Sequence, residues 1–94
     1  MILADKVAIV TGGGEGIGRG IVRCLAEEGA DVAVIDIKAA TANKVVDEVR
    51  SMGRRGLAII ADATSKEAVA KAVEDVITEF GKVDILVNNV GGTD

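Results

Sequence analysis

A glycine-rich stretch at residues 11–18 is the part of the sequence best suited to bind an anion. It reads Thr-Gly-Gly-Gly-Glu-Gly-Ile-Gly and joins an apolar run to an amphipathic segment that continues to Gly29. The first N–H groups of a helix lack intrahelical partners, and the helix dipole favours negative charge at that end. A glycine-rich turn between a strand and a helix therefore favours phosphate binding.

Spacing separates three phosphate-binding patterns. A Walker loop needs Lys and then Ser or Thr after its second glycine, but Arg19 and Gly20 follow Gly18. The G-x-G-x-x-G fingerprint fails at every possible start. The pattern that fits is Thr-Gly-x-x-x-Gly-Ile-Gly, with Gly12, Gly16, Ile17 and Gly18 in its fixed positions. A glycine-rich turn that binds no nucleotide remains an alternative.

Two acidic residues could select the cofactor. Asp36 ends a second apolar run eighteen residues beyond Gly18, where a dinucleotide-binding fold presents a carboxylate to the ribose hydroxyls. A carboxylate there accepts hydroxyl hydrogen bonds and repels a 2′-phosphate. Glu15 adds negative charge within the turn, and Lys38 is the only base nearby. We therefore expect NAD to be preferred over NADP, although Asp36 could also be an ordinary polar strand end.

The segments that position these residues alternate between strand and helix patterns. Apolar, β-branched runs predict buried parallel strands at 6–10, 31–36, 57–61 and 83–87. Helical periodicity covers 17–29, 39–52 and 64–80, and the last helix begins with a capping-box pattern of Thr64 and Glu67. This alternation predicts one α/β domain over residues 1–94 with a doubly wound parallel sheet. The glycine turn and the Asn88-Asn89 loop would then face each other.

Three motifs resemble elements of the short-chain dehydrogenase/reductase family. The Thr-Gly-x-x-x-Gly-Ile-Gly turn is similar to the nucleotide-binding turn of the family. Asp62-Ala63-Thr64 resembles its Asp-Val-Thr/Ser element, and Asn88-Asn89-Val90-Gly91 resembles its Asn-Asn-Ala-Gly element. The resemblance covers nearly the whole chain. It implies a Rossmann-type sheet of strand order 3-2-1-4, truncated after the fourth strand.

The resemblance also implies residue roles. Asp62 would meet the adenine amino group, Asn89 would lie beside the cofactor ribose, and Asn88 would brace the central strands. NADP-preferring relatives often carry a base in the turn where this chain has Glu15, which again favours NAD. Asp62 could instead merely start a turn. The cofactor site implied in this way consists of Gly12, Gly14, Glu15, Gly16, Ile17, Gly18, Asp36, Asp62, Ala63, Asn89 and Gly91.

Groups for catalysis are missing from the 94 residues. The reaction of the family uses a Ser and a Tyr-x-x-x-Lys pair further downstream, whereas this sequence has no Tyr, no His and a single Cys. We expect no catalytic residue and no metal site here. We interpret the chain as the NAD-binding N-terminal part of an oxidoreductase that moves hydride between nicotinamide and an alcohol or carbonyl substrate. The alternatives are a non-catalytic NAD-binding module and an assembly module that pairs through its fourth strand.

Charge and composition limit the kinds of partner that the chain is expected to bind. With 15 acidic and 11 basic residues the net charge is −4, and the bases are scattered, which argues against nucleic acid and anionic membranes. A single Cys24 and the absence of a signal-peptide pattern suggest the cytoplasm. The open edge of the fourth strand predicts a homo-oligomer that pairs near residues 83–89.

Overall fold

The computed structural model describes residues 1–12 and 14–89, which form a parallel four-stranded sheet and three helices. The strand order is β3-β2-β1-β4, so the predicted doubly wound topology is confirmed. In chain order the elements are β1 (Val7–Thr11), α1 (Gly16–Glu27), β2 (Asp31–Asp36), α2 (Ala39–Ser51), β3 (Gly56–Ile60), α3 (Lys66–Phe80) and β4 (Ile85–Asn88).

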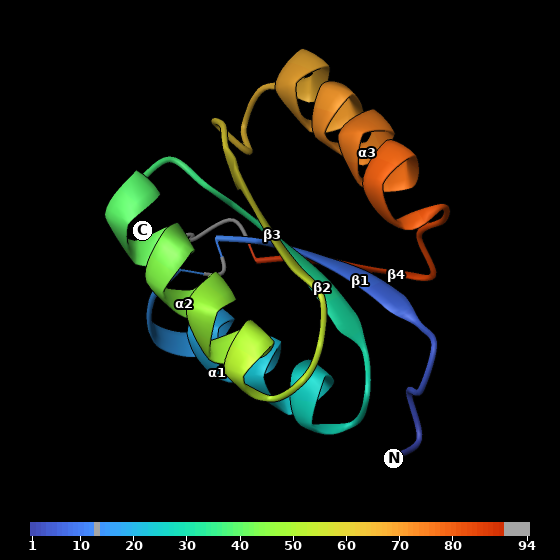
Figure 1. The fold of residues 1–94 in the computed structure, drawn as a ribbon. Helices are drawn as coiled ribbons and strands as arrows, with labels where there is room; N and C mark the ends of the chain where they lie inside the picture. Colours follow the sequence, from blue (N-terminus) through green and yellow to red (C-terminus); the bar gives the residue numbers. More distant parts are fainter. Residues whose placement is uncertain (13, 90–94) are drawn as a thin grey trace.

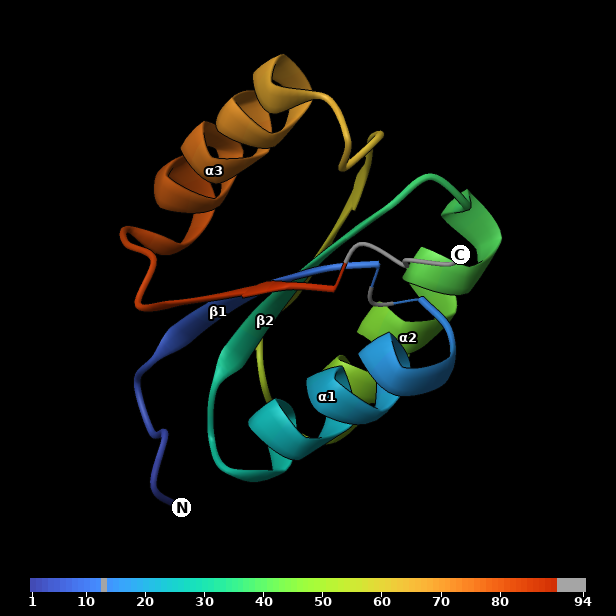
Figure 2. The same cartoon turned by 180° about the vertical axis from the view of Figure 1, so that it is seen from behind.

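The helices divide unequally between the two faces of the sheet. Helices α1 and α2 cover one face, and α3 alone lies over the other (Figures 1 and 2). The first two crossovers move in one direction along the sheet, and the third returns past β1 to β4. Because β-α-β crossovers keep one hand, this reversal sends α3 to the opposite face.

Small aliphatic side chains fill the core on both faces, as a sequence with one aromatic residue requires. Strand β1 is buried along its whole length, and β2 is buried except at its two ends. On the α1/α2 face Val10 and Val34 pack with Val22 and Val45, whereas on the α3 face Ile9 and Ile35 are among the buried residues. The two strands alternate their side chains between these clusters, as strands covered on both faces must.

Strand register brings the chemically interesting residues to one edge. Thr11 at the end of β1 pairs with Ile35 on one side and with Asn88 on the other. Asp36 pairs with Ile60 at the end of β3. Because parallel strands share a direction, their carboxyl ends and the loops that follow lie at the same edge of the sheet.

The helix ends partly follow the sequence prediction. Gly29 follows the C-cap of α1 with φ of 104°, a left-handed conformation that glycine adopts without strain. The capping role predicted for Thr64 is wrong. The Oγ of Ser65 accepts from Ala68 N–H (3.2 Å) and caps α3, because the Thr64 hydroxyl and N–H both donate to Asp62. None of the three helices combines the length and apolar character that a membrane span requires, over the residues described.

Candidate cofactor site

Asp36 organises the loops at the carboxyl edge of the sheet. The Gly14 N–H donates to its Oδ2 (3.0 Å), and the Lys38 N–H donates to its Oδ1 (3.1 Å). One carboxylate thus ties the glycine turn to the loop before α2. Each carboxylate oxygen keeps a lone pair, so Asp36 can still accept hydrogen bonds from a ligand.

Two of the predicted turn residues must be glycine because other backbone segments pack closely against them. A Cβ on Gly18 would lie 2.0 Å from the Gly12 carbonyl oxygen and 2.8 Å from Nδ2 of Asn89. Gly12 has φ of +66°, and its Cβ would lie 2.4 Å from the Asn89 carbonyl oxygen. These contacts leave no room for a side chain, because α1 packs on the turn at Gly18 and Asn89, which follows β4, packs on it at Gly12.

The other two glycines predicted in the turn, Gly14 and Gly16, lie at the amino end of α1. A Cβ on Gly14 would lie 2.7 Å from Oδ2 of Asp36 and 2.8 Å from Oγ1 of Thr41. Gly16 opens α1 with φ of +57°, and no atom stands within 4 Å of a Cβ placed there. The N-cap residue Glu15 makes no side-chain capping bond. The first-turn N–H groups of α1 therefore lack a side-chain acceptor at this cap, which suits a phosphate.

A network centred on Thr11 joins β1 to the end of β4. The Thr11 hydroxyl donates to Oδ1 of Asn88 (3.0 Å) and accepts from the Asn89 N–H (2.9 Å). The Asn89 amide also donates to the Gly12 carbonyl (3.3 Å). Both asparagines therefore brace the strands. Thr11 is 2% exposed and was not among the predicted site residues, although it is the first residue of the Thr-Gly-x-x-x-Gly-Ile-Gly pattern.

A hollow of about 150 Å³ lies between the ends of β1, β2 and β3. Asp62, at its rim, accepts from the Thr64 N–H (2.9 Å) and hydroxyl (2.6 Å), and these hydrogen bonds lower the pKa of Asp62. The fold thus brings together residues that are up to 77 positions apart in the sequence. The predicted residues in its lining are Gly12, Asp36, Asp62, Ala63 and Asn89.

The remaining predicted residues lie apart from this hollow. The Glu15 side chain pairs with Lys38, with 3.1 Å between Oε1 and Nζ, and lines a second hollow beside Gly14. Ile17 is 77% exposed, so it faces outward from α1. Gly91 lies outside the described residues. Within residues 1–12 and 14–89, no cluster of three His, Cys, Asp or Glu side chains could hold a metal ion.

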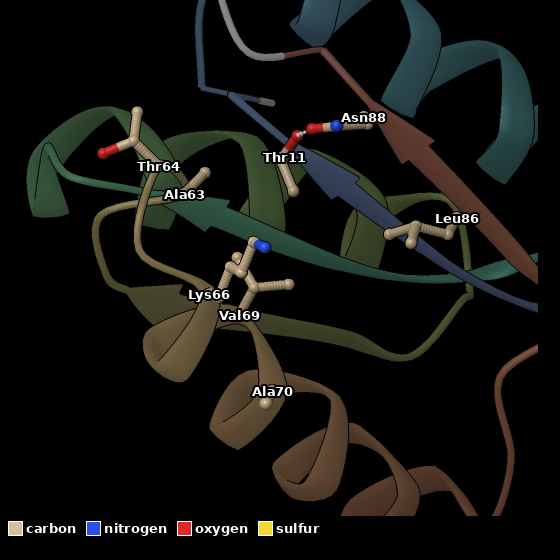
Figure 3. A pocket seen from close by; sticks show the side chains of 8 residues that line it. All are labelled: Thr11, Ala63, Thr64, Lys66, Val69, Ala70, Leu86 and Asn88. Atoms are coloured by element: carbon tan, nitrogen blue, oxygen red, sulfur yellow. Dashed lines mark hydrogen bonds between the residues drawn. The ribbon is translucent and has the colours of Figure 1, made fainter.

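A larger apolar hollow, of about 350 Å³, lies between α3 and β4. Figure 3 shows Leu86 from β4 and Val69 from α3 at its sides, with the Thr11–Asn88 hydrogen bond at one end. Ala63 lines both this hollow and the smaller one. The apolar hollow therefore adjoins the candidate cofactor site on the face of the sheet that carries a single helix.

Comparisons with known proteins show the family of the chain. The family model for short chain dehydrogenases matches residues 6–94. The chain is 47% identical over 90 residues to the 7alpha-hydroxysteroid dehydrogenase of Escherichia coli K12, covering 96% of this chain and 35% of that protein. It thus spans about a third of the length of the curated relatives that it matches.

Solved structures that resemble this chain also include short-chain dehydrogenases. A short chain dehydrogenase from Burkholderia cenocepacia J2315 in complex with NADP has a TM-score of 0.94 at 45% identity, over 100% of this chain and 39% of that one. Carveol dehydrogenase from Mycobacterium avium in complex with NAD has a TM-score of 0.92 at 33% identity, over 99% and 38%. The resemblance inferred from the motifs is confirmed, and the chain belongs to the short-chain dehydrogenase family.

Proposed function

We propose that this chain is the cofactor-binding part of an NAD-dependent oxidoreductase acting on an alcohol or carbonyl substrate. The observation that carries the proposal is the position of Asp36, which is bound to the glycine turn and lines the hollow between the strand ends. The names of relatives support the substrate class, since they include a hydroxysteroid dehydrogenase and a cyclohexanol dehydrogenase. The single, exposed Cys24 suits the reducing cytoplasm.

The residues fit an adenine dinucleotide in three respects. The N–H groups at the start of α1, beside Gly16, can donate to the pyrophosphate. Asp36 has lone pairs for the ribose hydroxyls, and the hollow beside Asp62 and Ala63 offers space for the adenine. Bound nicotinamide would supply the hydride chemistry. The part of these residues is to bind and orient the cofactor.

NAD is the proposed cofactor because Asp36 lines the hollow proposed for adenosine and Glu15 adds a second negative charge in the glycine turn, so that a 2′-phosphate near them would be repelled. Titration calorimetry with NAD and NADP tests this preference. We expect NAD to bind more tightly, and Asp36→Ala to weaken NAD binding by about tenfold or more, the order expected for losing charge-assisted hydrogen bonds. Equal dissociation constants for the two cofactors in the unmodified chain would contradict the preference.

We further propose that these 94 residues alone do not turn over substrate. The sequence has no Tyr and no His, so these residues do not include the tyrosine that the family uses as its general acid or base. The test is nicotinamide absorbance in a preparation verified by mass, with cyclohexanol and a hydroxysteroid as substrates. Turnover by such a preparation, free of host dehydrogenase, would refute this part of the proposal.

A second candidate function, edge-to-edge assembly, has its own support in β4. Among the described residues β4 pairs only with β1, and Leu86 is 54% exposed beside the apolar hollow. Unpaired strand edges are templates for another chain. Sedimentation should then detect a homo-oligomer that Leu86→Lys dissociates. A monomer at high concentration, with β4 protected from hydrogen exchange, would exclude assembly through this edge.

A further inference from the structure

Strand β3 forms one edge of the sheet and pairs with β2 alone among the described residues (Figure 1). Just before β3 the Arg55 carbonyl accepts from the Val32 N–H, and just after it the Ala61 N–H donates to the last residue of β2, both at 3.0 Å. Backbone groups alternate in direction along a strand. The N–H and C=O groups of Ala58 and Ile60 therefore point away from β2, toward the open edge.

This edge lacks the features that usually protect an edge strand. Such strands commonly carry a charged residue, a proline or a bulge that discourages pairing with another chain. Strand β3 reads Gly-Leu-Ala-Ile-Ile, with no charged residue and no proline. Its first residue is covered from α2, since Nη2 of Arg50 donates to the Gly56 carbonyl (3.0 Å). The edge from Ala58 to Ile60 is therefore available to a further strand.

A hollow of about 360 Å³ lies between β3 and α3. It shares no lining residue with the hollow proposed for adenosine or with the apolar hollow beside β4. Strand β3 contributes apolar residues and α3 contributes only polar ones, so the hollow has an apolar floor and a polar wall. The lining residues are Leu57, Ala58, Ile59, Asp75, Thr78 and Glu79.

The α3 wall of this hollow is acidic, and its carboxylates are weakly engaged. Oδ1 of Asp75 lies 3.5 Å from Nζ of Lys71, and exposed pairs of this kind contribute little. None of the ion pairs of the described residues includes Glu79. The base that precedes β3, Arg55, is already paired with Asp31 (2.9 Å). The wall can therefore attract a positive charge from another molecule.

An added strand would place its side chains alternately on the two faces of the sheet. On the α3 face a Lys or Arg fits, because its aliphatic stem can lie along Leu57 and Ile59. Its charged end would then meet the carboxylates of Asp75 and Glu79. On the opposite face an apolar side chain fits beside Ile60, which is 48% exposed. The edge thus suits a segment in which basic and apolar residues alternate.

We propose that the open edge of β3 binds an extended segment of another protein in which basic and apolar residues alternate. Hydrogen bonds to the backbone of Ala58 and Ile60 hold the segment as a fifth strand, and the acidic wall selects its basic side chains. A second copy of this chain fits less well, because antiparallel pairing of two β3 strands would bring two acidic walls together. The inference is independent of cofactor binding, since the hollows are separate.

The test uses a short peptide with blocked termini in which lysine and valine alternate, titrated into the unmodified chain by calorimetry and NMR. We expect the amide signals of Ala58 and Ile60 to shift, and the affinity to fall at high salt. Asp75→Asn combined with Glu79→Gln should weaken binding about fivefold or more, as for two exposed charge contacts. Absence of binding to the unmodified chain would overturn the inference.

A matched pair of substitutions controls for the loss of net charge. Glu27→Gln combined with Asp47→Asn removes the same charge at positions outside the lining of the hollow. This variant should bind the peptide with unchanged affinity, and circular dichroism checks that both variants are folded. Equal weakening by the two pairs of substitutions would show that only net charge matters and would overturn the role given to the acidic wall.

Two N-methylated forms of the peptide test strand addition itself. Successive N–H groups of an added strand point alternately toward β3 and away from it. N-methylation of every lysine, or of every valine, therefore removes only one of these two rows of donors. One form should lose binding and the other should keep it. If both forms bind equally, or both fail to bind, the peptide does not add as a strand and the inference is wrong.

Sedimentation distinguishes a second copy of the chain as the occupant of this edge. Self-association that saturating peptide reverses would mean that β3 pairs with another copy, and the proposal of a basic partner would be wrong. Self-association that Leu86→Lys abolishes, with peptide binding unchanged, would place the contact between copies at β4. That outcome would support β3 as a separate docking edge.

Discussion

Helices α1 and α3 both follow a parallel strand, yet their amino ends are built in opposite ways. The α3 end is closed, because the Ser65 hydroxyl accepts from the Ala68 N–H (3.2 Å) and Glu67 lies in the first turn. The α1 end has no side-chain cap and no acidic residue in its first turn, and it rests on a turn of glycines. The closed end satisfies its donors within the protein, whereas the open end has donors available for an anion.

The difference between the two helix ends indicates the role of the glycines in the turn before α1. At α3 ordinary side chains supply the cap, and this end of the helix could exist in any α/β protein. At α1 the backbone of Gly18 lies directly against the Gly12 carbonyl and the side-chain amide of Asn89. Such an arrangement gives up capping energy of about 1 kcal/mol. That cost is consistent with a binding site and has no evident structural purpose.

Adding one methyl group at Gly18, in the open end of α1, should have the largest effect on stability and on NAD binding. In Gly18→Ala the Cβ would lie 2.0 Å from the Gly12 carbonyl oxygen, and that neighbour is backbone, which cannot rotate away. We expect a loss of about 3 kcal/mol in the free energy of unfolding, measured by urea denaturation, and loss of NAD binding.

Gly20→Ala is the control within the same helix. Nothing stands within 4 Å of a Cβ at this position, so the change should stabilise α1 by about 0.5–1 kcal/mol. If both substitutions were tolerated equally, the close contact between α1 and the glycine turn would be refuted.

Removing the buried hydroxyl of Thr11 should have the next largest effect. Thr11→Val keeps the shape but leaves Oδ1 of Asn88 and the N–H of Asn89 without their partner, at a cost of about 1–3 kcal/mol. Urea denaturation measures the loss. Thr11→Ser keeps the hydroxyl and should recover most of it. If serine were no better than valine, lost packing rather than lost hydrogen bonding would be the cause.

Sequence reasoning recovered the fold because hydrophobic periodicity and glycine position are local signals. The apolar runs at 31–36 and 57–61 became β2 and β3 almost unchanged, and Gly29 ended α1 as expected. It also found residues that meet only in the folded chain, such as Asp36 and Asn89, because the order of strands fixes which loops are neighbours.

The details of the site that could not be predicted from the sequence depend on competition between hydrogen bonds. Thr64 and Ser65 are equally good capping residues by type, and the choice fell to Ser65 because Asp62 already holds Thr64. The Glu15–Lys38 pair joins positions 23 residues apart, and no periodic pattern predicts such a contact. Thr11 and both asparagines form a network whose partners only the strand register determines.

Removing the cap of the closed end should cost less. Ser65→Ala deletes the acceptor for the Ala68 N–H and should lower the free energy of unfolding by about 1 kcal/mol, with NAD affinity unchanged. Thermal denaturation and calorimetry of the same preparations measure both quantities. Thr64→Ala is the matched control, since its hydroxyl serves Asp62 instead of the helix. A larger loss in Thr64→Ala than in Ser65→Ala would restore Thr64 as the important residue at this end.

The smallest expected effect is a pH dependence of stability that comes from Asp62, in the loop before α3. Hydrogen bonds from the Thr64 hydroxyl and N–H lower the pKa of Asp62 in the folded chain. A depressed folded pKa contributes stability that is present above the unfolded value of about 3.9 and is lost as the pH falls through the folded value. The free energy of unfolding of the unmodified chain should therefore differ from that of Asp62→Asn by more at about pH 7 than at about pH 2.5. Asp47→Asn, whose carboxylate only faces Arg50, serves as the comparison. A stability difference for Asp62→Asn that stayed constant across this range would mean that the Asp62–Thr64 turn does not depend on the charge of the carboxylate.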